Sequence, residues 1–91
     1  MMNDSTVFAG RVLKQIRKKR GFTQQMLANR VGFSVRTLQA YEQGHRDFRL
    51  CPVIFFARCA DSFAMTIKQL WLAIDAHDPY GWNDGYFDTD C

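Results

Sequence analysis

The chain has 91 residues, of which 47% are hydrophobic, and a formal net charge of +3. This length favours one small domain with its own core and excludes several domains of ordinary size. Neither a secretory leader nor an apolar run near the roughly 20 residues that span a bilayer is evident, and the three cysteines suit a reducing compartment. We therefore expect a cytoplasmic protein without a membrane partner.

The charges are distributed unevenly along the chain. Residues 11–49 contain ten Lys and Arg against Glu42 and Asp47, whereas residues 75–91 contain five Asp and neither Lys nor Arg. A basic body suggests a polyanionic partner such as nucleic acid, although basic residues on helix faces can also serve solvation alone.

The first predicted helix runs from residue 5 to residue 20. Ser5 can cap its start, and Gly21 follows it as a terminating glycine after a basic last turn. Apolar residues recur at helical spacing along this segment. The residues expected to face inward are Phe8, Ala9, Val12, Leu13 and Ile16.

Two short helices are predicted next, over residues 24–31 and 35–43, with a corner of three residues between them. Gly32 suits a left-handed backbone at this corner, which costs a residue with a Cβ roughly 1–2 kcal/mol. Ala28 is small where the second helix must cross, and Leu38 faces back into the angle. Residues suited to capping precede both helices, namely Thr23 and Ser34. These offsets are typical of a helix-turn-helix, whose second helix can enter a DNA major groove.

The segments Gly21-Phe22-Thr23-Gln24-Gln25-Met26-Leu27-Ala28, Val31-Gly32, Ser34, Thr37-Leu38 and Tyr41-Glu42-Gln43-Gly44 combine many constrained positions. Together they resemble the Cro/cI-type (Xre-like) helix-turn-helix repressors of phages and bacteria. The resemblance covers about residues 8–74 and implies an all-α, five-helix, lambda-repressor-like DNA-binding domain. We assign residues 1–74 to this domain and residues 75–91 to a short non-helical tail that is acidic and aromatic.

The resemblance and the outward face of the third helix together suggest DNA contacts. The expected base-reading residues are Val35, Arg36, Thr37, Gln39 and Ala40. Arg36 could bond guanine bidentately, worth roughly 1–3 kcal/mol of discrimination, or contact only the DNA backbone. The expected phosphate-binding residues are Gln24, Arg17, Ser34, Gln43, Arg46 and Arg49. Arg17 also resembles the family arginine that pairs with a glutamate near the end of the recognition helix, here Glu42; the alternative is a solvated surface charge.

After Gly44 the connecting loop is longer than the family pattern. We expect Phe48 and Leu50 to fill the core, and Pro52 to take the first position of a fourth helix over residues 52–63. That helix is apolar on nearly every side, so it would be buried centrally or against a second subunit.

A capping box, Thr66-Ile67-Lys68-Gln69, opens a fifth predicted helix. The residues expected to face inward are Ile67, Leu70, Trp71 and Ile74. Trp71 and Leu72 resemble family positions near the dimer contact, and we place them with Phe63 at a homodimer interface; alternatively they only close the monomer's core. The tail could pack on the body, swap onto a partner subunit or bind another protein.

We therefore expect a sequence-specific transcriptional regulator, a repressor by resemblance, that binds double-stranded DNA at a pseudo-palindromic operator as a homodimer. The alternative is the antitoxin of a toxin–antitoxin pair, binding operator DNA through the same domain and a toxin protein through the tail. The sequence contains no evident nucleophile–base pair, phosphate-binding glycine loop or metal cluster. We expect no enzymatic activity, no cofactor and no metal site.

Overall fold

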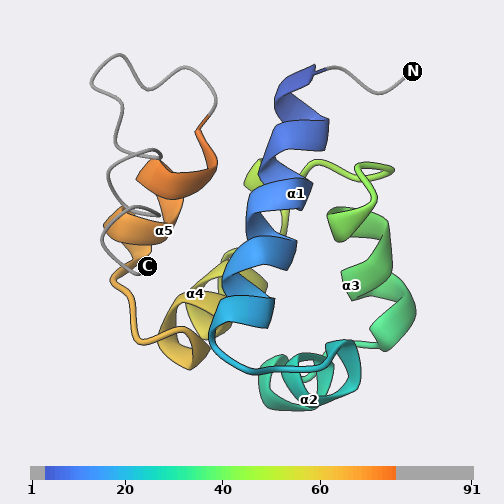
Figure 1. The fold of residues 1–91 in the computed structure, drawn as a ribbon, viewed down its shortest axis with the longest axis vertical. Coiled ribbons are helices and arrows are strands. Elements are labelled where there is room, and N and C mark those ends of the chain that lie inside the picture. The colour runs from blue at the N-terminus through green and yellow to red at the C-terminus, as the bar shows by residue number, and fades with distance from the viewer. Residues whose placement is uncertain (1–3, 76–91) are drawn as a thin grey trace.

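The computed structural model describes residues 4–75, which form five α-helices and one short 3-10 helix. The elements are α1 (Asp4–Lys19), α2 (Gln24–Val31), α3 (Val35–Glu42), η1 (Phe48–Leu50), α4 (Val53–Ser62) and α5 (Ile67–Ile74). Helix α1 runs between α3 on one side and α5 on the other, and α2 lies across its carboxyl end (Figure 1). The expected all-α fold with five helices is confirmed for these residues, and residues 76–91 of the expected tail lie outside them.

The first helix begins at Asp4, so Ser5 lies inside α1 and is not the N-cap that we expected. The expected glycine stops are confirmed. Beyond α1, Gly21 has φ +82°, and the Phe22 amide donates to the Arg17 carbonyl at 3.0 Å. Beyond α3, Gly44 has the same φ, and the His45 amide donates to the Ala40 carbonyl at 2.9 Å. Both ends have the hydrogen bonds of a Schellman motif, whose left-handed residue is usually glycine. Among the helices of residues 4–75, none is long and apolar enough to cross a membrane.

Helix α4 ends in the same motif, but with alanine in place of glycine. The Met65 amide donates to the Ala60 carbonyl at 2.9 Å, and the Ala64 amide donates to Asp61 at 3.0 Å. Ala64 consequently has φ +58°, although its methyl group is exposed to solvent and gains little packing. The left-handed conformation costs an L-residue with a Cβ roughly 1–2 kcal/mol, so this site carries local strain.

Replacing Ala64 by glycine should therefore stabilise the domain. We expect Ala64→Gly to raise the free energy of unfolding by about 0.5–1 kcal/mol, after the larger entropy of glycine in the unfolded chain is subtracted. Urea denaturation monitored by circular dichroism would measure it. The matched control is Ala57→Gly in the interior of α4, where the same change should destabilise by about 1 kcal/mol. Equal losses at both positions would contradict a strained Ala64.

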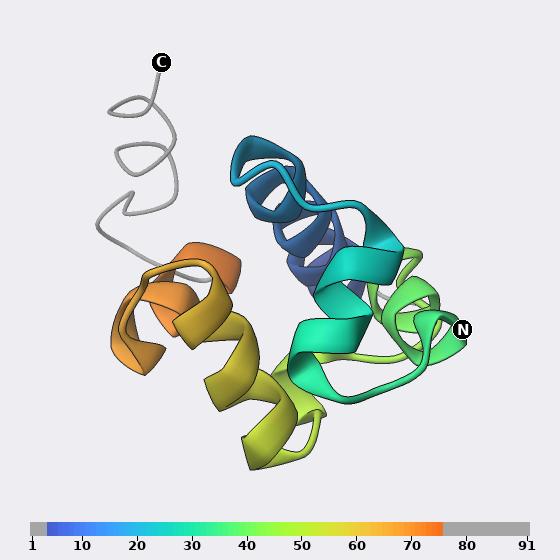
Figure 2. The same ribbon diagram turned by 90° about the horizontal axis from the view of Figure 1, so that it is seen from below.

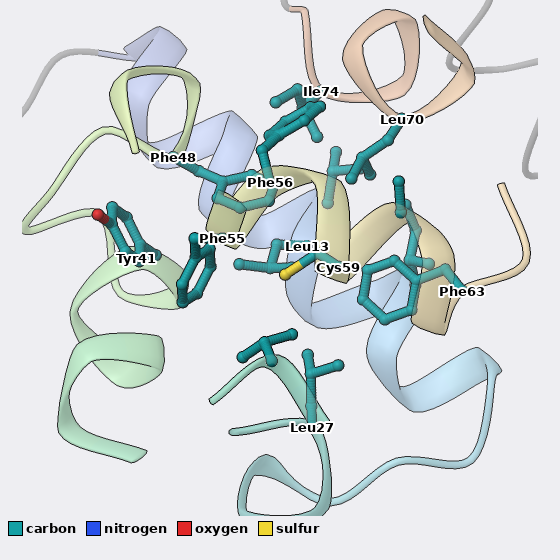
Figure 3. Close-up of a cluster of buried hydrophobic side chains, with 14 of the residues drawn as sticks. Leu13, Leu27, Tyr41, Phe48, Phe55, Phe56, Cys59, Phe63, Leu70 and Ile74 are labelled. Atoms are coloured by element: carbon teal, nitrogen blue, oxygen red, sulfur yellow. The ribbon is translucent and has the colours of Figure 1, made fainter. Parts of the chain in front are cut away.

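The core is built from the inner faces of all five helices together with η1. Leu13 of α1 and Cys59 of α4 lie near its middle, and aromatic rings surround them (Figure 3). Phe48 and Phe56 lie 5.2 Å apart between ring centroids, and Phe55 makes an edge contact with Phe33 at 4.6 Å. Such aromatic pairs add about 0.5–1.5 kcal/mol beyond the burial of their area.

Several residues expected in the core lie elsewhere. Phe48 is fully buried as expected, but Leu50 is 82% exposed, because the single turn of η1 directs these two side chains to different sides. In α5 the buried residues are Leu70, Ala73 and Ile74, whereas Ile67 and Trp71 are 52% and 40% exposed. The inward face of α5 is thus displaced from the predicted one. Pro52 precedes α4 as its N-cap residue and is not the first helical residue.

Helix α1 lies very close to the backbone at the end of α3 at Gly10, a residue that the sequence analysis did not single out. A Cβ at this position would lie 2.2 Å from the Tyr41 carbonyl oxygen and 2.9 Å from that of Glu42. Both neighbours are backbone atoms, which cannot rotate away as a side chain could. Only glycine allows this crossing, and the crossing determines how α3 is held against the body.

Candidate nucleic-acid interface

The corner between α2 and α3 has the geometry that the sequence predicted. The Thr23 hydroxyl accepts the Met26 amide at 3.1 Å, and the Ser34 hydroxyl accepts the Thr37 amide at 3.1 Å. Gly32 between them has φ +74°. Ala28 and Leu38 are buried at the contact of the two helices, as expected. These caps satisfy backbone donors at both helix starts and fix the angle at which α3 leaves the corner.

The exposed side of α3 carries the predicted base-reading residues. Arg36 is exposed, and the other four, Val35, Thr37, Gln39 and Ala40, are partly accessible. The opposite side, with Leu38, Tyr41 and Glu42, is buried against the rest of the domain. Figure 2 shows α3 and α5 at opposite sides of the molecule, so the exposed side of α3 is not covered by α5.

A buried ion pair joins α1 to the end of α3. The Arg17 Nε donates to the Glu42 Oε2 at 2.6 Å, and its Nη2 donates to the Oε1 at 3.2 Å. The remaining Nη1 donates to the Phe22 carbonyl at 2.8 Å. The predicted pairing of Arg17 with Glu42 is therefore present, in the bidentate form that arginine and carboxylate favour.

Two glutamines extend this ion pair toward the surface. Gln24, the first residue of α2, donates its amide to the Glu42 Oε1 at 3.0 Å. The side-chain amide of Gln39 in α3 in turn donates to the Gln24 Oε1 at 3.2 Å. We call this set, Arg17, Glu42, Gln24 and Gln39, the polar network. The sequence analysis assigned both glutamines to DNA contact but missed the bond between them, which depends on how α2 and α3 cross.

The polar network changes the role expected for Arg17. This side chain is only 7% exposed, and each guanidinium nitrogen already donates a hydrogen bond. Such burial weighs against the expected phosphate contact. We infer that Arg17 acts by positioning Glu42 and, through it, the two glutamines.

The remaining basic candidates differ in where they lie. Arg46 is exposed beyond α3, with its guanidinium 5.5 Å from the centre of the Tyr41 ring. Arg49 instead donates to both Asp47 carboxylate oxygens, at 3.0 and 2.7 Å, and lines a groove beside α5. The hydrogen bonds between the two side chains are the main cause that raises the pKa of Arg49, and they are also the main cause that lowers the pKa of Asp47. Arg49 is thus committed to an ion pair near α5, which weighs against its expected phosphate contact.

The other predicted site residues have clear positions. Ser34 and Gln43 are exposed at the two ends of α3. Phe63 is completely buried in the core, which weighs against its expected place at a dimer interface, whereas Trp71 is exposed and Leu72 is partly so. Within residues 4–75, no group of three His, Cys, Asp or Glu could hold a metal ion. Burial raises the pKa of the Cys51 thiol to about 11, which keeps it protonated at neutral pH and makes it a weak nucleophile.

Comparisons with known proteins agree with this geometry. Residues 13–50 match the family model HTH_3, described as helix-turn-helix. Among solved structures, the restriction-modification controller protein C.AhdI from Aeromonas hydrophila is similar, with a TM-score of 0.66 and 20% sequence identity. The similarity covers 75% of this chain and 98% of that chain, and at this identity it shows the shared fold. No curated protein sequence matches.

Proposed function

We propose that this chain is a DNA-binding transcriptional regulator, because its residues 13–50 belong to the Cro/cI-type (Xre-like) helix-turn-helix family. We propose further that it binds a pseudo-palindromic operator as a homodimer and represses transcription there. Repression would follow from occlusion of a promoter by the bound protein. The family match is to a DNA-binding module and not to an enzyme.

The observation that carries the proposal is the exposed side of α3 next to the polar network. Arg36 lies near the amino end of α3, where recognition helices come closest to base edges, and it is free to extend into a major groove. Gln24 and Gln39 are held by hydrogen bonds before any DNA arrives. Such preorganisation lowers the conformational entropy that these side chains lose on binding DNA. It also favours one position of α3 along the DNA groove over others.

Phosphate contacts would surround this reading surface. The candidates that remain accessible are Gln24, Ser34, Gln43 and Arg46. Gln24 stands at the amino end of α2, where backbone amides and the helix dipole favour an anion. The affinity should fall steeply with salt, since each neutralised phosphate releases condensed counterions.

A homodimer is supported by an exposed apolar face on η1, α4 and α5. We call this surface the apolar face; its members are Leu50, Val53, Ile54, Ile67 and Trp71. Three of these residues, Val53, Ile67 and Trp71, line one groove, and large exposed apolar patches often mark sites of protein association. We propose that two copies meet here, with Leu72 at the margin, so that a twofold axis relates two α3 helices and two half-sites about 34 Å apart.

Selection from random-sequence double-stranded DNA tests the proposal. A sequence-specific dimer should enrich an inverted repeat with one helical turn between half-sites. Retention that is independent of sequence and disappears uniformly with salt would instead identify a non-specific anchor, and the proposal would fail.

Arg36→Ala should relax the selected motif at one base position in each half-site. We expect the affinity for the selected site to fall by about 1–3 kcal/mol for each half-site contact, with unfolding free energy changed by less than about 0.5 kcal/mol. Fluorescence anisotropy at fixed salt would measure the affinity. Lys68→Ala is the control, because it removes an exposed cation from α5, on the other side of α1 from α3. Equal effects of the two substitutions would contradict a base-reading Arg36.

A further inference from the structure

We infer that the groove between the start of α4 and α5 is a binding site for residues 76–91 of the same chain, and that the Trp82 ring occupies it. Only one consequence of this inference, the effect of the tail on dimerisation, rests on the proposed function. The binding itself stands on the shape, chemistry and position of the groove.

The groove has the size and lining for one aromatic ring. Its walls are formed by Arg49, Cys51, Val53, Phe56, Ile67 and Trp71, and this open groove has a volume of about 220 Å³. A cavity of about 150 Å³ is enough to hold benzene, so a larger ring can enter here. The Phe56 and Trp71 rings lie 6.1 Å apart at 62°, and they offer aromatic edges and faces to a third ring.

The segment that follows α5 complements this groove. Residues 76–91 contain four aromatic residues, four Asp and neither Lys nor Arg. The groove is lined mainly by apolar and aromatic side chains, and the charge of Arg49 at its wall is already paired with Asp47. An aromatic ring suits this lining, because burial of its apolar surface against aromatic walls supplies affinity.

The connection to α5 makes this binding intramolecular. Asp75 follows α5 directly, about one helical turn beyond Trp71, which lines the groove, so the chain leaves α5 near the margin of the groove. Trp82 follows Asp75 by seven residues, which can span up to roughly 24 Å when extended. The whole of α5, with eight residues, is only about 12 Å long. Trp82 can therefore reach any point along the groove at a high effective concentration.

Occupation of the groove has a consequence for assembly. Val53, Ile67 and Trp71 belong both to the groove and to the apolar face that we propose as the dimer contact. A ring seated among them covers part of that face, so the tail and a second copy compete. Trp82→Ser in the full chain should accordingly tighten dimerisation several-fold, as measured by sedimentation equilibrium.

Tryptophan fluorescence tests the binding directly. The chain has only two tryptophans, so Trp71→Phe leaves Trp82 as the single reporter while preserving an aromatic wall. We expect blue-shifted emission and an acrylamide quenching constant several-fold below that of the same variant in urea. Adding Ile67→Asp, which places a charge on a half-exposed wall at the first position of α5, should abolish this protection. Adding Met26→Asp, an equivalent change in the first turn of α2, should leave it intact.

Three results would overturn the inference. Trp82 could be as accessible to acrylamide in buffer as in urea. Its protection could persist with Ile67→Asp, which would exclude the groove as its location. Protection that grows with protein concentration in step with dimerisation would assign the groove to a second copy. None of these measurements uses DNA, so their failure is distinguishable from failure of the proposed regulator.

Discussion

Gly10→Ala should destabilise the domain by about 3 kcal/mol, although alanine is the better helix former by about 1 kcal/mol. The new methyl group would lie 2.2 Å from the Tyr41 carbonyl oxygen, and α1 and α3 would have to move apart to admit it. Because the crossing places the polar network, DNA binding should weaken even where the protein remains folded. Thermal unfolding should show a fall in melting temperature of roughly 10–20 °C.

The control for Gly10 is Gly21→Ala. Gly21 has φ +82°, but a Cβ added there would meet no atom within 4 Å, so alanine at this position encounters backbone strain without a collision. We expect a loss of about 1 kcal/mol at Gly21, clearly less than at Gly10. If Gly10→Ala were neutral or stabilising, helix propensity would dominate, and the close crossing of α1 and α3 would be refuted.

Removing one partner of the buried ion pair should be comparably damaging. We expect Glu42→Leu to cost about 3–5 kcal/mol, because Arg17 would remain buried without its counter-charge. The same change removes the acceptor of the Gln24 amide, so the Gln24–Gln39 pair loses its anchor. Urea denaturation would measure stability, and anisotropy with operator DNA would measure affinity.

The double variant Arg17→Met/Glu42→Leu separates these two effects. Replacing both charges by apolar side chains of similar size is often neutral for stability, so we expect most of the lost stability to return. Operator affinity should remain low, since the Gln24 amide does not regain its Glu42 acceptor and the Gln24–Gln39 pair stays without its anchor. Recovery of both properties together would show that the polar network serves stability alone and does not position Gln24 and Gln39 for DNA.

The sequence by itself determined the features that depend on local chemistry. The caps at Thr23, Ser34 and Thr66 and the glycines after α1, α2 and α3 could be predicted because each satisfies backbone groups within a few residues. The helix-turn-helix followed from the same signals at fixed offsets. The Arg17–Glu42 pair lies outside this rule, and its prediction came from the family resemblance alone.

Only the tertiary structure decided which apolar residues are buried and which polar residues meet. Helix α5 has apolar residues on two adjoining faces. Contact with α1 and α4 buries the face with Leu70, Ala73 and Ile74 and leaves Ile67 and Trp71 exposed. The single turn of η1 turned Leu50 outward, and the ion pair with Asp47 drew Arg49 toward α5. The need for glycine at position 10 and the Gln24–Gln39 bond arise where two helices cross. Crossing positions depend on the packing of the whole domain, and helical periodicity within one segment does not specify them.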